Sequence, residues 1–201
     1  MKIGWVVAAL FVAALAGVYA TMNTPLFGQR DSRALVGGPF TLVDSNGKRV
    51  TDRDFRGKLM LVFFGYAHCP DICPTELQTL SDVMEKLGPD AEKVAPVFIS
   101  VDPGRDTPEE LSSYMKNFDP RITGLTGEEK DIERVAKAYR VYYRKAAESG
   151  ANDYSVDHSA FVYFMDGEGK YVTHFPFNVR AGTILTAIKN KIAADKTPER
   201  P

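Results

Sequence analysis

Two short, almost unbroken apolar runs constrain the fold of this chain more than any other feature. They occupy residues 59–66 (LMLVFFGY) and 94–101 (VAPVFISV). Runs of this length that are rich in strand-forming residues are typical of strands buried on both faces. Between them, apolar residues recur at offsets of three and four, which predicts an amphipathic helix over residues 74–87. The order strand, helix, strand predicts the α/β class.

The remaining segments extend this pattern. Residues 40–43 and 48–50 flank an Asn-Gly turn signal and predict a β-hairpin. Thr107 followed by Pro108, Glu109 and Glu110 predicts the start of a helix that runs to about residue 118. We also expect a strand at 122–125, a helix at 128–143, a loop at 144–153, a hairpin at 159–165 and 170–174, and a helix at 183–193. This order predicts a thioredoxin-like mixed sheet flanked by helices, in one domain over residues 39–194 with a polar tail at 195–201.

The amino terminus forms a separate segment. An uncharged apolar run of 18 residues, 3–20, follows Lys2. As a helix it would span about 27 Å, close to the ~30 Å hydrocarbon core of a bilayer. We therefore expect a transmembrane anchor over residues 1–20, with a cleaved signal peptide ending near Ala20 as the alternative. Either reading exports the rest of the chain, and the polar stretch at 21–38 is interpreted as a linker.

Charge and cysteine content exclude several classes of protein. The chain has 25 lysines and arginines against 26 aspartates and glutamates, so no strong positive field favours nucleic acid, and we expect no such partner. It contains two cysteines, which are too few for a disulfide-stapled scaffold. These cysteines are therefore interpreted as a functional site.

Cys69 and Cys73 lie where the first apolar strand leads into the predicted helix. Unpaired amides and the dipole at a helix amino terminus favour anions, so we expect lowered thiol pKa values. If the turn is helical, residues four apart share a face, and both sulfurs could hold one metal ion. A disulfide would need a local adjustment of the backbone. Metal binding and redox chemistry both remain open at this point.

A third ligand would have to come from one of the chain's three histidines if it is an imidazole. Thiolates with an imidazole suit copper or zinc, and two cysteines cannot complete an iron-sulfur set. We interpret His68 as a loop residue and His174 as an ordinary hairpin histidine. His158 precedes a predicted strand, with Asp157 available to orient its ring. Spacing alone nevertheless favours an ordinary loop histidine at this position.

Three motifs together resemble the Sco/SenC family of copper-binding, cytochrome oxidase assembly proteins. They are Cys69-Pro70-Asp71-Ile72-Cys73-Pro74, then Ser100-Val101-Asp102-Pro103 with Arg105-Asp106-Thr107-Pro108, and Val156-Asp157-His158. The resemblance covers about residues 35–192. It implies a thioredoxin-like fold, an amino-terminal anchor, and copper held by Cys69, Cys73 and His158, as Cu(I) with Cu(II) as a second state. On their residues alone, Asp102 and Asp106 are interpreted as turn residues.

For function, the resemblance implies a copper metallochaperone that delivers copper to, or matures, the CuA site of cytochrome c oxidase, rather than a classical enzyme. Its expected partners are the oxidase subunit carrying CuA, a periplasmic copper donor and a thiol reductant. A thiol-disulfide oxidoreductase that reduces the cysteines of a metal-site client is the alternative, and a peroxidase is a third candidate. Because the amino terminus lacks an Arg- and Ser-rich transit peptide, we expect a single-pass protein of the bacterial cytoplasmic membrane facing the periplasm.

Overall fold

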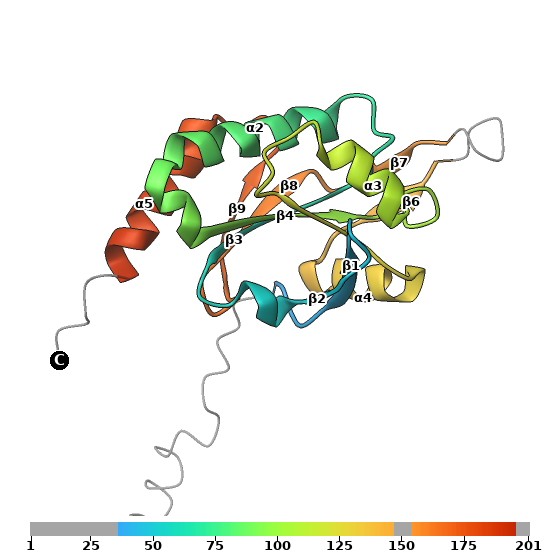
Figure 1. Ribbon diagram of the computed structural model, residues 1–201, viewed down its shortest axis with the longest axis horizontal. Coiled ribbons are helices and arrows are strands. Elements are labelled where there is room, and N and C mark those ends of the chain that lie inside the picture. Colours follow the sequence, from blue (N-terminus) through green and yellow to red (C-terminus); the bar gives the residue numbers. More distant parts are fainter. Residues whose placement is uncertain (1–35, 147–153, 196–201) are drawn as a thin grey trace, which may run out of the picture. The chain divides into compact units, whose positions relative to one another are not determined.

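The computed structural model describes residues 36–146 and 154–195 (Figure 1). The strands are β1 (Thr41–Asp44), β2 (Arg49–Thr51), β3 (Leu59–Gly65), β4 (Val94–Ser100), β5 (Thr123–Thr126), β6 (Tyr143–Lys145), β7 (Val156–His158), β8 (Phe161–Met165) and β9 (Tyr171–Pro176). The helices are η1 (Asp52–Phe55), α2 (Ile72–Leu87), η2 (Gly88–Lys93), α3 (Pro108–Met115), α4 (Glu129–Tyr139) and α5 (Ala181–Asp195). Within these residues, no helix has the length and apolar character needed to cross a bilayer. The predicted anchor lies outside the described residues, as do most of the linker and nearly all of the tail.

The two apolar runs form neighbouring strands at the centre of a seven-stranded sheet with the order β2-β1-β5-β4-β3-β8-β9. β3 and β4 are parallel, with Phe63 opposite Phe98, and α2 makes the crossover between them. β8 pairs antiparallel with the other edge of β3, and β9 pairs antiparallel with β8. The predicted α/β class and mixed sheet are therefore confirmed.

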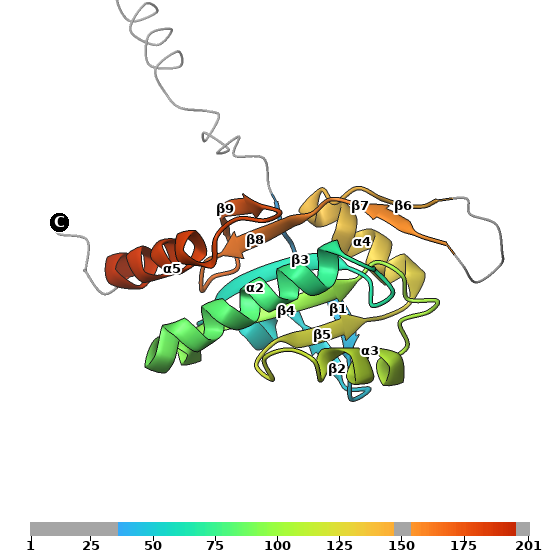
Figure 2. The same ribbon diagram turned by 90° about the horizontal axis from the view of Figure 1, so that it is seen from above.

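Helices cover both faces of this sheet, which explains why β3 and β4 are apolar throughout. Helices α2, α3 and α5 lie on one face and α4 lies on the other (Figure 2). Successive residues of a strand point to opposite faces. Phe63 accordingly packs beside Phe98 on the face of α3, whereas the ring of Phe64 lies 5.3 Å from that of Tyr139 in α4. Every residue of β3 is buried as a result.

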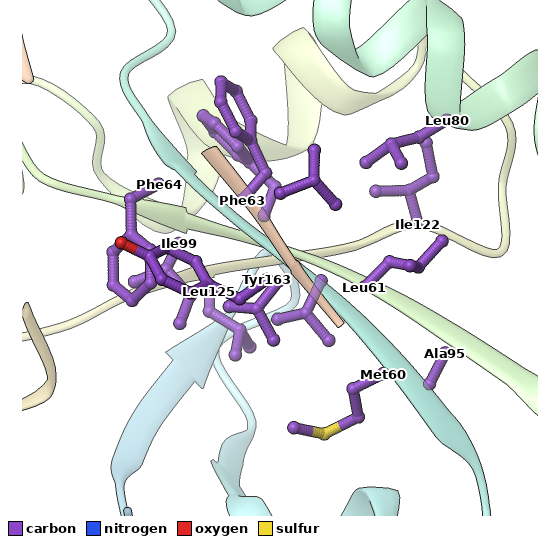
Figure 3. Packing of buried hydrophobic residues seen from close by; sticks show 14 of the residues in the cluster. Met60, Leu61, Phe63, Phe64, Leu80, Ala95, Ile99, Ile122, Leu125 and Tyr163 are labelled. Atoms are coloured by element: carbon purple, nitrogen blue, oxygen red, sulfur yellow. The ribbon is translucent and has the colours of Figure 1, made fainter. Parts of the chain in front are cut away.

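The hydrophobic core follows the two central strands (Figure 3). Residues of β3 meet Leu80 from α2, Ile99 from β4 and Leu125 from β5, and these three side chains are fully buried. Complete burial of one such side chain contributes roughly 1.5–3 kcal/mol. The core therefore provides a rigid base directly beneath the end of β3, where the cysteine motif begins.

The helix predicted at 128–143 is too long, and the loop predicted at 144–153 begins too early, because residues 144 and 145 belong to β6. Residues 147–153 of that loop lie outside the described residues. Helix α4 ends at Tyr139 because Arg140 adopts a left-handed conformation with a φ of 58°. The chain then enters β6, which pairs antiparallel with β7 so that Tyr143 lies opposite His158. A left-handed residue at a helix end is usually glycine, so arginine gives no stop signal in the sequence.

Candidate metal centre

The cysteines lie where β3 leads into α2. Helix α2 begins at Ile72, two residues before the predicted start, so Cys73 lies in its first turn. Cys69 precedes the helix, and the helical turn that would have joined both thiols is absent at this point. The two sulfurs nevertheless lie within 4.8 Å of each other. The backbone N–H of Cys73 also donates to Sγ of Cys69 at 3.5 Å. Cys73 has no exposed surface, whereas Cys69 is half-buried.

His158 completes a cluster of three potential ligands. It stands at the end of β7, and its Nε2 lies 3.4 Å from Sγ of Cys73. The two sulfurs and an imidazole nitrogen all lie within 4.8 Å of one another. A mononuclear site with sulfur ligands at about 2.3 Å and nitrogen at about 2.0 Å requires separations of this order. The fold therefore brings together three residues that the sequence separates widely.

The imidazole of His158 is packed between aromatic rings. The ring of Tyr66 lies 5.9 Å away and that of Phe63 lies 6.1 Å away, both edge-on. Nδ1 of His158 lies 3.2 Å from the carbonyl oxygen of Ser159, which can accept a hydrogen bond from Nδ1–H. In that tautomer the proton stays on Nδ1 and Nε2 is free to ligate. The ring is thus oriented with Nε2 toward the dithiol.

Asp157 does not play the orienting role that we expected. Its carboxylate lies 3.4 Å from the guanidinium of Arg144, and its side chain is 55% exposed. Adjacent residues of a strand point to opposite sides, so Asp157 faces away from the side on which His158 meets the cysteines. The backbone carbonyl of Ser159, which no sequence pattern identifies, takes the place beside Nδ1.

The two thiols differ in their affinity for a proton. A hydrogen bond from the thiol of Cys73, and lesser ones from His158 and nearby backbone amides, lower the pKa of Cys69 to about 3 although burial opposes this shift. The same hydrogen bond to Cys69, together with burial, raises the pKa of Cys73. In the metal-free dithiol these opposite shifts favour a thiolate at Cys69 and a proton at Cys73. A soft cation can replace that proton.

The other two histidines lie outside this cluster. His68 is in the turn, and its Nδ1 lies 3.5 Å from a carboxylate oxygen of Asp106. His174 is in β9, where its Nδ1 contacts the hydroxyl group of Tyr171. We predicted a loop position for His68 and a hairpin position for His174, and the structure confirms both positions.

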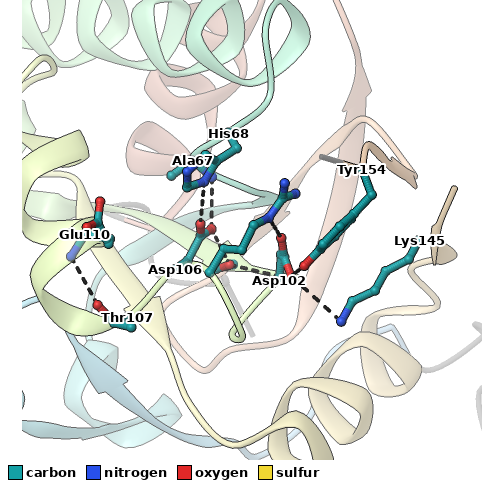
Figure 4. A network of polar contacts seen from close by, with 10 residues as sticks. Ala67, His68, Asp102, Asp106, Thr107, Glu110, Lys145 and Tyr154 are labelled. Atoms are coloured by element: carbon teal, nitrogen blue, oxygen red, sulfur yellow. Dashed lines mark hydrogen bonds and ion pairs between the residues drawn. The ribbon is translucent and has the colours of Figure 1, made fainter. Parts of the chain in front are cut away.

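Asp102 and Asp106 are more than turn residues, because both are fully buried. Figure 4 shows their polar contacts. Oδ2 of Asp106 accepts hydrogen bonds from the hydroxyl of Ser100 at 2.6 Å and from the backbone amide of Ala67 at 2.9 Å. It therefore fastens the loop after β4 to the turn that carries Cys69. Asp102 instead contacts residues near the β6–β7 hairpin, which are described below.

Gly65 allows Cys73 to approach the sheet. A Cβ atom at this position would lie 2.6 Å from Sγ of Cys73 and 2.9 Å from the ring of Phe98. Contacts this short do not occur in folded proteins, so this position accepts no side chain without displacing its neighbours. We did not predict from the sequence that Gly65 makes room for Cys73. The available signal was a glycine at the end of a strand of large apolar residues.

Fold and site together define a class of protein: a thioredoxin-like α/β domain whose cysteine turn and a distant histidine form a metal-binding set. A profile of the SCO1/SenC family matches residues 28–193. The chain is 40% identical over 176 residues to the SCO2-like protein of Rickettsia prowazekii, covering 86% of each chain. It is also 40% identical over 161 residues to the human mitochondrial SCO1 homolog, covering 78% of this chain and 52% of the human protein.

A solved structure shows the same relationship. The structure of Bradyrhizobium japonicum ScoI with copper bound superposes with a TM-score of 0.73 at 45% sequence identity. The match covers 78% of this chain and 99% of the ScoI chain. This chain belongs to the SCO1/SenC family.

Proposed function

We propose that this protein is a copper metallochaperone that holds Cu(I) between Cys69, Cys73 and His158. The observation that carries the proposal is the convergence of their ligand atoms within 4.8 Å. Two sulfurs and one imidazole form a soft ligand set that suits Cu(I). The copper-bound structure of the related ScoI supports the choice of copper over zinc.

We further propose that the client is the CuA site of cytochrome c oxidase, and that the protein delivers copper to this site or matures it. Support comes from membership of the SCO1/SenC family, because the resemblance of this chain to that family implies this role. The apolar run at residues 3–20 supports tethering to the bacterial cytoplasmic membrane with the domain in the periplasm. A periplasmic copper donor and a thiol reductant complete the proposed set of partners.

Competition with a calibrated Cu(I) chelator tests the proposed ligand set on the purified, reduced full-length chain. We expect His158→Ala to weaken Cu(I) binding by more than about tenfold, which corresponds to ~1.4 kcal/mol. Cys69→Ser combined with Cys73→Ser should abolish tight binding because no soft ligand remains. His174→Ala is the matched control, since this histidine lies outside the cluster, and it should leave the affinity unchanged. Wild-type affinity in either ligand variant would overturn the proposed site.

The lowered pKa of Cys69 favours a second candidate function, thiol-disulfide exchange with a client's cysteines. In that reaction the Cys69 thiolate attacks a client disulfide, one client sulfur leaves as a thiolate, and Cys73 then resolves the mixed disulfide. Cys73→Ser should therefore trap a mixed disulfide, visible by mass spectrometry, with a peptide carrying the oxidised CuA cysteines. Failure to trap any adduct would argue against this function.

The two functions are linked through the oxidation state of the dithiol. Bridged sulfurs cannot act as two thiolates, so a Cys69–Cys73 disulfide should prevent Cu(I) uptake. Measuring copper bound per chain before and after oxidation, with Cys73→Ser as a control that cannot form this bridge, checks the prediction. Equal uptake by oxidised and reduced wild-type protein would contradict it.

A further inference from the structure

His158 belongs to a two-stranded sheet that is separate from the seven-stranded one. The position of its ring over the dithiol therefore depends on what holds the β6–β7 hairpin in place. At the end of the hairpin next to β8, the backbone N–H of Ser159 donates to the carbonyl of Tyr142 at 2.9 Å, and the backbone N–H of Tyr142 donates to Oγ of Ser159 at 3.0 Å. These bonds join the two arms of the hairpin to each other, close to where the chain enters β8.

Contacts with the loop after β4 hold the opposite end of the hairpin. The hydroxyl of Tyr154, two residues before β7, donates to Oδ1 of Asp102 at 2.7 Å (Figure 4). Nζ of Lys145, the last residue of β6, lies 4.0 Å from the same oxygen. The guanidinium of Arg105 stacks on the Tyr154 ring, 3.7 Å from its centre, and also binds the other oxygen of Asp102. We call this group of four residues the Asp102 latch.

The turn that contains Asp102 does not depend on the Asp102 carboxylate. The backbone carbonyl of Asp102 accepts from the amides of Arg105 and Asp106, which closes the turn without any side chain. The backbone amide of Asp102 donates to Oγ of Ser100 at 3.0 Å. Burying a carboxylate is costly unless it is paired and hydrogen-bonded. The groups that pair with this carboxylate are the hydroxyl of Tyr154 and the ammonium of Lys145. The guanidinium of Arg105 also pairs with it and stacks on the ring of Tyr154.

We propose that the Asp102 latch is a positioning device that holds the hairpin closed and so keeps His158 against Cys69 and Cys73. The proposal rests on the proposed function, because it assumes that His158 contributes to copper binding. Where a binding-competent conformation is only partly populated, the apparent affinity falls in proportion to its population. Opening the latch should therefore weaken copper binding without removing any ligand.

Tyr154→Phe tests the latch most directly, because it removes the hydroxyl donor while keeping the ring beneath Arg105. We expect the Cu(I) affinity of the reduced full-length chain to fall roughly tenfold, the scale of a lost hydrogen bond to a charged group. Tyr142→Phe is the matched control, since it removes the hydroxyl of an exposed tyrosine beside β6. It should leave the affinity unchanged. Asp102→Asn is a second variant, which should weaken binding in the same direction.

A double-mutant cycle separates positioning from a general loss of structure. If the latch acts through His158, then Tyr154→Phe should have no further effect on Cu(I) affinity in the His158→Ala background. Equal effects of Tyr154→Phe in both backgrounds would overturn the proposal, as would unchanged affinity in the wild-type background.

A metal-free measurement distinguishes failure of the latch from failure of the copper function. Opening the hairpin should make His158 react with diethylpyrocarbonate several-fold faster in Tyr154→Phe than in wild type, with Tyr142→Phe unchanged. If wild type bound no Cu(I), or if His158→Ala had no effect, the copper function would fail, and faster modification in Tyr154→Phe would still support the latch. Equal modification rates in wild type and Tyr154→Phe would overturn it.

Discussion

At the scale of single residues, the cysteine motif contains two chemically different thiols. Cys73 is fully buried, and its pKa is raised by the hydrogen bond to Cys69 and by burial. Cys69 is half-buried, and its pKa is lowered to about 3, mainly by the hydrogen bond from Cys73. Because the thiolate is the nucleophilic form, Cys69 is the thiol that meets other molecules first.

This difference predicts an unusual pH dependence of alkylation. In the reduced, metal-free chain, Cys69 should react with iodoacetamide at a rate that stays high through neutral and mildly acidic pH. The rate should fall only as the pH drops through about 3, because a lowered pKa keeps the thiolate above that value. Peptide mass mapping of the alkylated residue provides the measurement. Cys73→Ala removes the largest cause of the shift and should move the midpoint upward; a wild-type midpoint near the ordinary ~8.5 would contradict the prediction.

Gly65 yields a second residue-scale prediction. Gly65→Ala places a methyl group where Sγ of Cys73 and the ring of Phe98 already lie. Overpacking of this kind typically costs about 1–3 kcal/mol, so we expect a loss of that order in the free energy of unfolding measured with urea. Gly182→Ala in α5 is the matched control, because a Cβ there meets nothing within 4 Å and alanine favours a helix. Equal stability of the two variants would refute the steric argument.

At the scale of elements, the end of α4 decides where the His158 hairpin begins. Arg140 adopts a positive φ of 58°, and the backbone N–H of Val141 donates a hydrogen bond to the carbonyl of Ala136 at 2.8 Å. The helix ends with this hydrogen bond, and the chain continues into β6. A non-glycine residue in a left-handed conformation costs roughly 1 kcal/mol, which the surrounding contacts must offset.

Replacing this residue should therefore stabilise the protein. We expect Arg140→Gly to raise the free energy of unfolding by about 0.5–1 kcal/mol, because glycine adopts the left-handed conformation without the Cβ penalty. Lys137→Gly, in the last turn of the same helix, should instead lower it by roughly 1 kcal/mol. Urea denaturation of both variants tests the pair. Destabilisation by Arg140→Gly would show that the arginine side chain contributes more than the backbone strain costs.

The elements around the site show what the sequence could and could not predict. β3, β4 and α2 were recognisable because burial on two faces, or on one stripe, leaves a periodic apolar pattern. β6 and β7 are three residues each, and Val156 is their only buried residue, so they carry no such pattern. The proximity of His158 to the cysteines depends on that hairpin, which is why spacing alone favoured an ordinary loop histidine. Family resemblance, rather than periodicity, singled out His158, and the structure places its ring beside Cys73.

At the scale of the whole domain, Glu76 links α2 to the segment that leads into α5. It lies in α2, is 1% exposed, and its Oε2 accepts from the backbone amide of Asn178 at 3.4 Å, in the segment between β9 and α5. Burial raises its pKa above the ordinary value. The folded state therefore binds a proton at this site more tightly than the unfolded state does.

The sign of this shift predicts how stability depends on pH. The favourable contribution of protonated Glu76 is fully present below its unfolded pKa, near 4.5, and is lost as the pH rises through the higher folded value. Glu76→Gln cannot ionise, so we expect it to be more stable than wild type at pH 7, with the difference shrinking as the pH falls toward 4.5. Urea denaturation across this range checks the expectation. Glu85→Gln, on the exposed face of α2, is the matched control and should show no such trend.

The burial of Cys73 also governs how fast a bound ion can be exchanged. Cys73 has no exposed surface, so an acceptor approaches the ion past the half-buried Cys69 and His158. On that side an incoming thiolate can join the ion before a resident ligand departs, which makes exchange associative rather than dissociative. Stopped-flow transfer to a small dithiol should then show a rate that rises linearly with acceptor concentration, and a constant rate would contradict this. The proposed function requires both tight retention and rapid handover, and this exchange route makes the two compatible in one site.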